Sequence, residues 1–202
     1  MARDSAESKA NLKTDLLFPL DEVYRAANLE IPDVEELGGA KMPQPYRSLL
    51  VHQGDMTPAL EKFHGARIHL QVLNAWQREK PAFNKAGYLR EVVLRLDASD
   101  RPVEYGAILI YLDHFSAAAQ KEILEGRKPL GTVMREQHVI HLSRPRAYLS
   151  ASADAHIARV LNAPPGATLY GRRNQLLTQD QKILADIVEI LPLATDIENR
   201  QG

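Results

Sequence analysis

Two pairs of neighbouring apolar segments, each pair joined by a short polar turn, limit the fold of this chain most strongly. Gly87–Leu96 alternates apolar and polar side chains, and Pro102–Leu112 is the returning strand of the same hairpin. Thr168–Leu177 and Lys182–Leu191 form a second predicted hairpin. Hairpins pair their strands antiparallel, and helical segments lie between these two. We therefore predict the α+β class, with an antiparallel sheet and helices packed on one face.

The remaining secondary structure follows from capping residues and from hydrophobic periodicity. Thr57 and Pro58 predict a helix start, as N-cap and first helical residue, while Gly65 and Gly126 predict helix ends. The predicted helices cover residues 20–27, 57–64, 116–125 and 154–161, and the further strands cover 66–73, 137–142 and 147–150. Residues 128–131, Lys-Pro-Leu-Gly, are predicted to form a tight turn.

The composition is that of an ordinary globular protein, with 202 residues, 45% hydrophobic and 25% charged side chains and a net charge of -1. The near-zero charge argues against a general nucleic-acid binder, and no apolar stretch approaches the roughly 20 residues of a membrane helix. The lack of cysteine excludes disulfides and thiolate metal sites and fits a cytoplasmic protein. We expect neither a nucleic acid nor a membrane as partner.

One folded body is expected between two polar ends. Residues 1–15 are polar and mixed in charge, which predicts a disordered tail. Residues 15–45 are expected to form an arm, because Ile31-Pro32 and Met42–Pro45 interrupt regular structure. The predicted divisions are therefore 1–45 for the tail and arm, 46–192 for the body and 193–202 for the C-terminal tail.

A carboxylate and a guanidinium lie where apolar side chains are expected. Glu189 stands inside the aliphatic run 187–191, so it either faces solvent across the sheet or is directed inward. An inward carboxylate needs a cationic partner or a raised pKa. Arg90 shares its strand face with three aliphatic side chains, so it must pair with an acid or bind an anion. A buried salt bridge between Arg90 and Glu189 and a ligand site both remain open.

Two further motifs have a structural and a functional interpretation. Arg172-Arg173 indicates either one surface arginine and one structural ion pair, or a cationic patch beside an anionic ligand. His138 and His141 are three residues apart, which places them on opposite faces of a strand. On a helix both could reach one ion, but no cysteine and no carboxylate motif accompanies them, so we expect no metal site there.

Five short motifs, in order along residues 48–192, resemble the chorismate pyruvate-lyase family. They are Leu49-Leu50-Val51 before Asp55-Met56-Thr57, then Leu89-Arg90-Glu91-Val92-Val93-Leu94, Pro129-Leu130-Gly131, Leu169-Tyr170-Gly171-Arg172-Arg173 and Val188-Glu189-Ile190-Leu191-Pro192. The resemblance implies a sheet of about six antiparallel strands and a buried pocket for 4-hydroxybenzoate. It implies no metal and no organic cofactor.

The resemblance also implies roles for individual residues. Arg90 would hold the ring carboxylate, and Glu189 would face the 4-oxygen end, so these two would be the catalytic pair. Met56 would cover the ring, and Leu130 would offer a backbone contact. Arg172 and Arg173 are possible additional site residues.

The leading expectation is thus a lyase that eliminates pyruvate from chorismate to give 4-hydroxybenzoate or a related aromatic acid, as in ubiquinone biosynthesis. The rival is a non-catalytic binding or regulatory protein for a small aromatic or cyclohexadiene carboxylate, since the same general fold serves as the effector-sensing domain of some bacterial repressors. No DNA-binding helical module is evident, so such a protein would act through a partner. A third possibility is a structural or assembly factor with a filled pocket.

Overall fold

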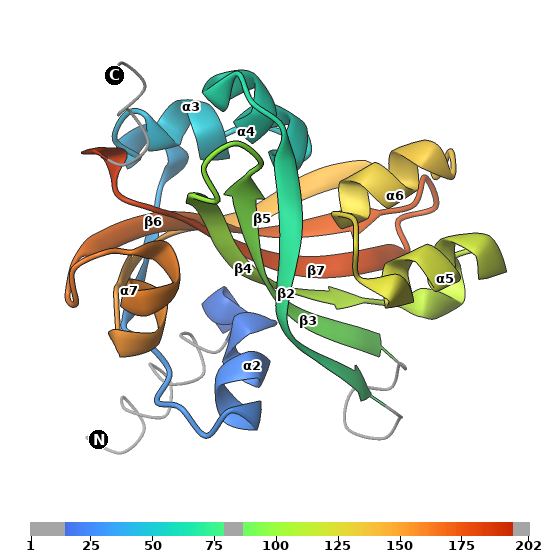
Figure 1. Ribbon diagram of the computed structural model, residues 1–202, viewed down its shortest axis with the longest axis horizontal. Helices are drawn as coiled ribbons and strands as arrows, with labels where there is room; N and C mark the ends of the chain where they lie inside the picture. Colours follow the sequence, from blue (N-terminus) through green and yellow to red (C-terminus); the bar gives the residue numbers. More distant parts are fainter. Residues whose placement is uncertain (1–14, 79–86, 196–202) are drawn as a thin grey trace.

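Both predicted hairpins are present in the computed structural model, which describes residues 15–78 and 87–195. They belong to one antiparallel sheet of seven strands in the order β1-β5-β6-β7-β4-β3-β2 (Figure 1). The strands are β1 (Val34–Leu37), β2 (Ile68–Arg78), β3 (Gly87–Leu96), β4 (Pro102–Ile110), β5 (Leu142–Ser152), β6 (Thr168–Leu177) and β7 (Ile183–Leu191). The α+β class with an antiparallel sheet is confirmed.

Short helices and 3-10 turns connect the strands. They are α2 (Leu20–Ala26), η1 (Gly39–Lys41), α3 (Tyr46–Leu50), α4 (Met56–His64), η2 (Leu112–His114), α5 (Ala117–Glu125), α6 (Leu130–Glu136) and α7 (Ala155–Leu161). The predicted stops at Gly65 and Gly126 are confirmed, because both glycines take the left-handed conformation that ends α4 and α5. Within residues 15–78 and 87–195, no helix has both the length and the apolar character needed to cross a membrane.

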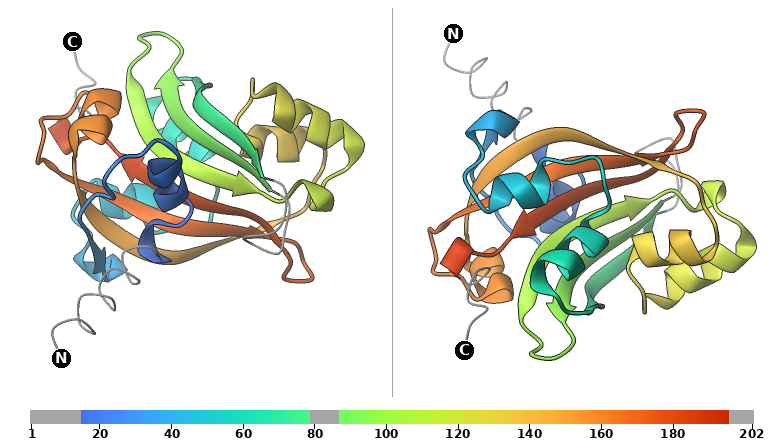
Figure 2. Two further views of the ribbon diagram at one scale, coloured as in Figure 1. Left: turned by 90° about the horizontal axis from the view of Figure 1, so that it is seen from below. Right: turned by 90° about the horizontal axis from the view of Figure 1, so that it is seen from above.

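Helices cover both faces of the sheet, not one. Figure 2 shows α2 across the sheet when the molecule is seen from below, and α3, α4, α5 and α6 over it when seen from above. Along β3 the two faces alternate: Leu89 and Val93 pack in the cluster with α2 and α7, whereas Leu94 packs with α3 and α4. The central strands are therefore buried on both sides, and the burial of every residue but one in β3 agrees with this.

The arm supplies the seventh strand. β1 pairs with β5, with Val34 opposite Ala151. Leu17 and Leu20 are fully buried in the hydrophobic cluster that α2 forms with the lower face of the sheet. Residues 15–45 thus pack in the same core as the body that was expected to begin at residue 46. The polar tails predicted at the two ends fall mostly outside the described residues, since the description begins at residue 15 and ends at 195.

Three local predictions were wrong in detail. The helix α4 begins at Met56 with Asp55 as its N-cap, two residues before the expected start. The predicted turn at 128–131 contains the start of α6, which follows Pro129. The segment predicted as a strand at 137–142 is instead the turn that follows α6, where His138 has a positive φ of 53°, and only Leu142 belongs to a strand, β5.

Candidate functional site

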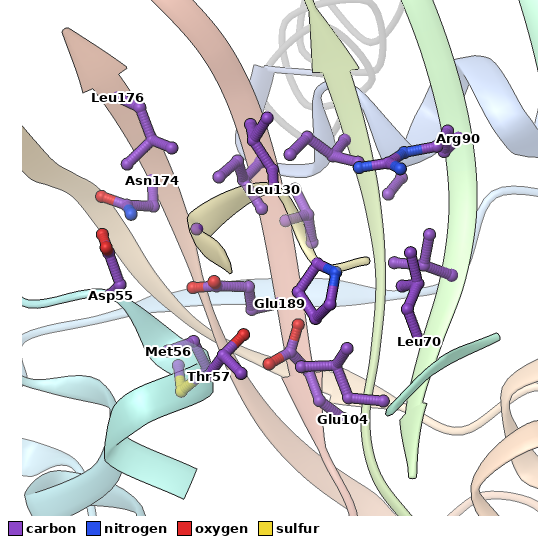
Figure 3. A pocket seen from close by; sticks show the side chains of 18 residues that line it. Asp55, Met56, Thr57, Leu70, Arg90, Glu104, Leu130, Asn174, Leu176 and Glu189 are labelled. Carbon is purple, nitrogen blue, oxygen red and sulfur yellow. The ribbon is translucent and has the colours of Figure 1, made fainter. Parts of the chain in front are cut away.

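A cavity lies between the upper face of the sheet and helices α4 and α6. It encloses about 600 Å³ of atom-free space, counting the part that is open to solvent. Its lining residues are Asp55, Met56, Thr57, Leu70, Arg90, Val92, Leu94, Glu104, Ala107, Ile108, Pro129, Leu130, Gly131, Asn174, Leu176, Ile187, Val188 and Glu189 (Figure 3). Most of this wall is apolar, so its few charged groups define its chemistry.

The register of the strands places the charged groups on one face. Arg90 lies opposite Ile108 of β4, and Glu189 of β7 lies opposite Gly106 of β4 and Arg172 of β6. Since side chains alternate across a strand, Arg90, Arg172 and Glu189 all point to the face covered by α4 and α6. The antiparallel pairing therefore gathers residues that are far apart in the sequence.

Arg90 is a buried cation without a carboxylate partner among the described residues. Its exposed fraction is 1%, its Nε has no hydrogen-bond partner, and its Nη1 lies 3.5 Å from the carbonyl oxygen of Ile123. The guanidinium stands 5.8 Å from the ring centre of Tyr88. Burial lowers the pKa of Arg90 to about 10, so it is still charged at neutral pH. A buried charge left unpaired is costly, so this guanidinium is suited to bind an anion.

Glu189 has a different partner from the one considered first. Arg172 donates from Nε to the Glu189 carboxylate, and both side chains are buried. The remaining guanidinium nitrogens of Arg172 donate to the carbonyl oxygens of His52 at 3.2 Å and Gly54 at 3.2 Å. This pair ties the sheet to the segment before α4, so the hypothesis of an Arg90–Glu189 salt bridge was wrong.

Glu104 is the second unsatisfied group of the cavity. It is 5% exposed, and its Oε2 has no hydrogen-bond partner within the described part of the chain. Burial, and next the negative charge of Glu189, raise the pKa of Glu104 well above its usual range, while Arg172 offsets part of this rise. The carboxyl groups of Glu104 and Glu189 point into the same space in Figure 3, with Arg90 at the other end.

The side of the cavity next to α4 is held by a hydrogen bond between a histidine and a carboxylate. His141 lies 3.0 Å from Asp55, measured from Nε2 to Oδ1, and this hydrogen bond raises the pKa of His141. Asn174 donates to the hydroxyl of Ser143 at 2.9 Å, which fixes the amide on the cavity wall. His141 thus anchors the capping residue of α4, while His138 lies in the preceding turn.

The structure brings four of the expected site residues together. Met56, Arg90, Leu130 and Glu189 all line the cavity. Arg172 lies beside it as the counter-charge of Glu189. By contrast, the next residue of β6, Arg173, points to the opposite face, where it pairs with Asp15 at 2.9 Å. Arg172 therefore forms the structural ion pair of the first interpretation, whereas Arg173, the expected surface arginine, is largely covered and pairs with Asp15.

Sequence reasoning missed Glu104, Asn174 and Asp55 as lining residues. Glu104 stands in the returning strand of the first hairpin, and its alternation with Tyr105 is the only signal the sequence carries. That signal cannot say which of the two faces holds a cavity. Asn174 has the same parity as Arg172, so the register of β6 would have included it once the arginine was placed.

Two glycines allow β7 to approach its neighbours beside Glu189. A Cβ at Gly106 would stand 2.2 Å from the carbonyl oxygen of Val188, and one at Gly171 would stand 2.3 Å from that of Glu189. Neither position has room for a side chain. The close approach of β4 and β6 to the two sides of β7 therefore requires glycine at both positions.

Comparison with known proteins gives the fold but not a family. No protein-family model matches the chain, and no curated protein matches its sequence. Solved structures do match. The effector domain of PhnF from Mycobacterium smegmatis aligns with a TM-score of 0.53 and 14% identity, over 69% of this chain and 88% of that one.

Two longer structures match as well. Another structure of PhnF from the same organism gives a TM-score of 0.54 and 13% identity, over 75% of this chain and 67% of that chain. A possible transcriptional regulator, YydK from Bacillus subtilis, gives a TM-score of 0.50 and 8% identity, over 63% and 58% of the two chains. The fold is thus chorismate lyase-like, and it is shared with the effector domain of PhnF.

This result corrects the leading expectation drawn from the sequence. The assignment to lyases and to ubiquinone biosynthesis was wrong, because the solved structures that match include an effector domain and a possible transcriptional regulator. The site agrees with the correction, since Glu189 is held by Arg172 instead of standing free for proton transfer. The regulatory or ligand-binding alternative is the better supported one.

Proposed function

We propose that this protein binds a small organic anion in the cavity between the sheet and helices α4 and α6, and that Arg90 holds the anionic group. The bound anion is sensed and not converted, as in an effector domain. The single observation that carries the proposal is the Arg90 guanidinium, which is buried in the cavity wall and has no carboxylate partner among the described residues.

The ligand-free cavity carries the energetic cost of a buried, unpaired guanidinium. Removing a guanidinium from water costs several kcal/mol, and among the described residues no carboxylate pairs with Arg90 to offset this cost. An anionic group bound beside Arg90 repays it through charge-assisted hydrogen bonds, each contributing roughly 1.5–3 kcal/mol. The guanidinium fork suits a carboxylate or another planar oxyanion.

The apolar wall sets the rest of the ligand. Leu70, Val92, Ile108 and Leu176 line the cavity with Arg90, and Met56 lies on the α4 side. Such a wall accommodates a ring or a short hydrocarbon body, and a small aromatic or cyclic carboxylate satisfies both features. A free inorganic oxyanion would pair with the Arg90 guanidinium but would make no use of the apolar wall.

The proposal is tested by isothermal titration calorimetry with benzoate, 4-hydroxybenzoate, 3-phenylpropionate and inorganic phosphate, and with neutral benzamide as the uncharged counterpart. We expect at least one carboxylate to bind the natural protein with a dissociation constant below about 1 mM, and benzamide not to bind. In Arg90→Met the affinity should fall by roughly tenfold to a hundredfold.

Arg173→Met provides the matched control, because Arg173 is the same residue type on the opposite face of the sheet. Carboxylate affinity in this variant should equal that of the natural protein. Equal carboxylate binding by natural protein and a folded Arg90→Met variant would overturn the proposal. So would the absence of binding by every anion in the set.

A further inference from the structure

Glu104 and Glu189 form a pair of neighbouring carboxyl groups at one end of the cavity. Gly106 lies opposite Glu189, and Glu104 is two residues before Gly106 on the same strand, so both carboxyls rise from the same face. Arg90 is at the level of Ile108, four residues along β4 from Glu104, which places the Cα positions of Arg90 and Glu104 roughly 13 Å apart along the strands. The cavity therefore has a cationic end and a carboxyl end (Figure 3).

The charged groups that face Glu104 leave it without a counter-ion. Arg172 of β6 is already bound to Glu189, and Asp55 at the start of α4 is paired with His141. Arg90 of β3 is at the far end. Among the described residues, no further cation lines the cavity.

Counting the charges then gives the protonation state of the carboxyl end of the cavity. If Arg172 and Glu189 cancel, an ionised Glu104 would be a lone negative charge beside Glu189, buried and without a hydrogen bond on Oε2. Two neighbouring carboxyls in such surroundings do not both ionise, and the proton belongs on Glu104 because Glu189 is already paired with Arg172. The raised pKa of Glu104, caused first by burial and next by Glu189, agrees with this count.

We propose that Glu104 determines ligand specificity as a neutral carboxylic acid: its hydroxyl donates a hydrogen bond to an uncharged acceptor on the ligand. The ligand class is then a monoanion whose charged group meets Arg90 and whose opposite end carries a hydroxyl, carbonyl or ether oxygen. This inference rests on the proposed function, since it concerns the same cavity.

The same arrangement rejects two related classes. A dianion would bring its second charge against Glu189 and Glu104, where no free cation compensates it. A zwitterion with its ammonium at this end would need Glu104 ionised. Selection by a neutral donor thus separates hydroxylated monoanions from dicarboxylates and from amino acids of the same length.

The test uses two matched pairs of acids, 4-hydroxybenzoate with benzoate, and 3-(4-hydroxyphenyl)propionate with 3-phenylpropionate. Terephthalate serves as the dianion and 4-(aminomethyl)benzoate as the zwitterion. Calorimetry at pH 7 on the natural protein should show at least one hydroxylated acid binding about tenfold more tightly than its partner. Terephthalate and 4-(aminomethyl)benzoate should bind more weakly than that acid.

Two variants of Glu104 separate the neutral from the ionised form. Glu104→Gln keeps the shape and a donor, so the affinity for the preferred acid should stay within about threefold of the natural value. Glu104→Leu keeps the volume but removes the donor, so the preference for the hydroxylated acid should disappear while the des-hydroxy acid binds as before. Thermal melting of both variants checks that they are folded.

Three outcomes would overturn the inference without touching the proposed function. The first is a Glu104→Gln variant that binds all carboxylates more than tenfold more tightly, which would mean that Glu104 was ionised. The second is that the zwitterion binds most tightly of all the acids. The third is a preference for the hydroxylated acid that survives in Glu104→Leu. If the carboxylates bind in an Arg90-dependent way and one of these is seen, only the role of Glu104 fails. If no carboxylate binds, the proposed function fails with it.

Discussion

Arg172 and Glu189 lie opposite each other on β6 and β7 and form a buried ion pair beside the cavity. The pair does two things at once. It neutralises the carboxylate that the sequence placed among aliphatic residues, and it binds the backbone before α4 through the carbonyl oxygens of His52 and Gly54. It therefore holds the wall of the cavity, while Arg90 and Glu104 line that cavity without a charged partner among the described residues.

Breaking this pair should destabilise the fold. Glu189→Gln leaves Arg172 buried without a counter-charge, so the free energy of unfolding should fall by about 3–5 kcal/mol, measured by urea denaturation at pH 7. Glu104→Gln is the control, because a neutral carboxyl loses little on becoming an amide, and its change should stay within about 1 kcal/mol. Equal stabilities of natural protein and Glu189→Gln would show that the pair is not structural.

The two buried arginines should respond oppositely to the same substitution. Arg90→Met removes an unpaired buried cation, so the ligand-free protein should be more stable by about 1–4 kcal/mol. Arg172→Met leaves Glu189 unpaired and should destabilise the protein by roughly 3–5 kcal/mol. Chemical denaturation of both variants without added anions measures the difference. A large loss of stability in Arg90→Met would mean that the fold depends on this guanidinium, against the interpretation as a ligand group.

A methyl group at Gly106 should disturb the sheet beside Glu189. Its Cβ would meet the Val188 carbonyl oxygen at 2.2 Å, a backbone atom that cannot move alone. Gly106→Ala should therefore cost about 1–3 kcal/mol or more in unfolding free energy. The control is Gly38→Ala, at a position with no atom within 4 Å of the new Cβ and a φ of -70°, where the change should be within about 0.5 kcal/mol. Similar melting temperatures for the two variants would contradict the close approach of β4 and β7.

The opposite face of the sheet should give the protein part of its acid sensitivity. Glu91 is buried there, and its carboxylate accepts hydrogen bonds from Asn74 at 2.7 Å, from Tyr105 at 2.9 Å and from His156 at 2.5 Å. Burial by itself would raise the pKa of Glu91, but the hydrogen bonds, that of His156 first, lower it below the usual 4.5.

A folded-state pKa below the unfolded value stabilises the protein at pH values above the unfolded pKa. That stability is lost as the pH falls from about 5 through the lower folded pKa. Glu91→Gln should be less stable at pH 7, and the difference from the natural protein should shrink as the pH is lowered from 5 to 3. Urea denaturation at a series of pH values measures this difference. A constant difference down to pH 3 would show that Glu91 does not titrate with the fold.

Much of the local structure could be predicted from the sequence because its signals are local. Alternation located β3, the hairpin turn after it located β4, and the glycines after α4 and α5 located two helix ends. The start of α4 was misplaced because Asp55 and Thr57 are both good capping residues and only packing chooses between them. The start of α6 was misread as a turn since Pro129 and Gly131 favour turns, whereas the helix is kept by burial of Leu130 and Val133.

By itself, the sequence determined the antiparallel hairpins, the burial of Arg90 on an apolar strand face, and the need of Glu189 for a cation if it points inward. These follow from the two-residue period of a strand and from the cost of burying charge. Only the tertiary structure decided that Arg172 and not Arg90 is that cation, and that Glu104 is the carboxyl left over. The reason is that partners across a sheet depend on the order and register of all seven strands, which no local pattern contains.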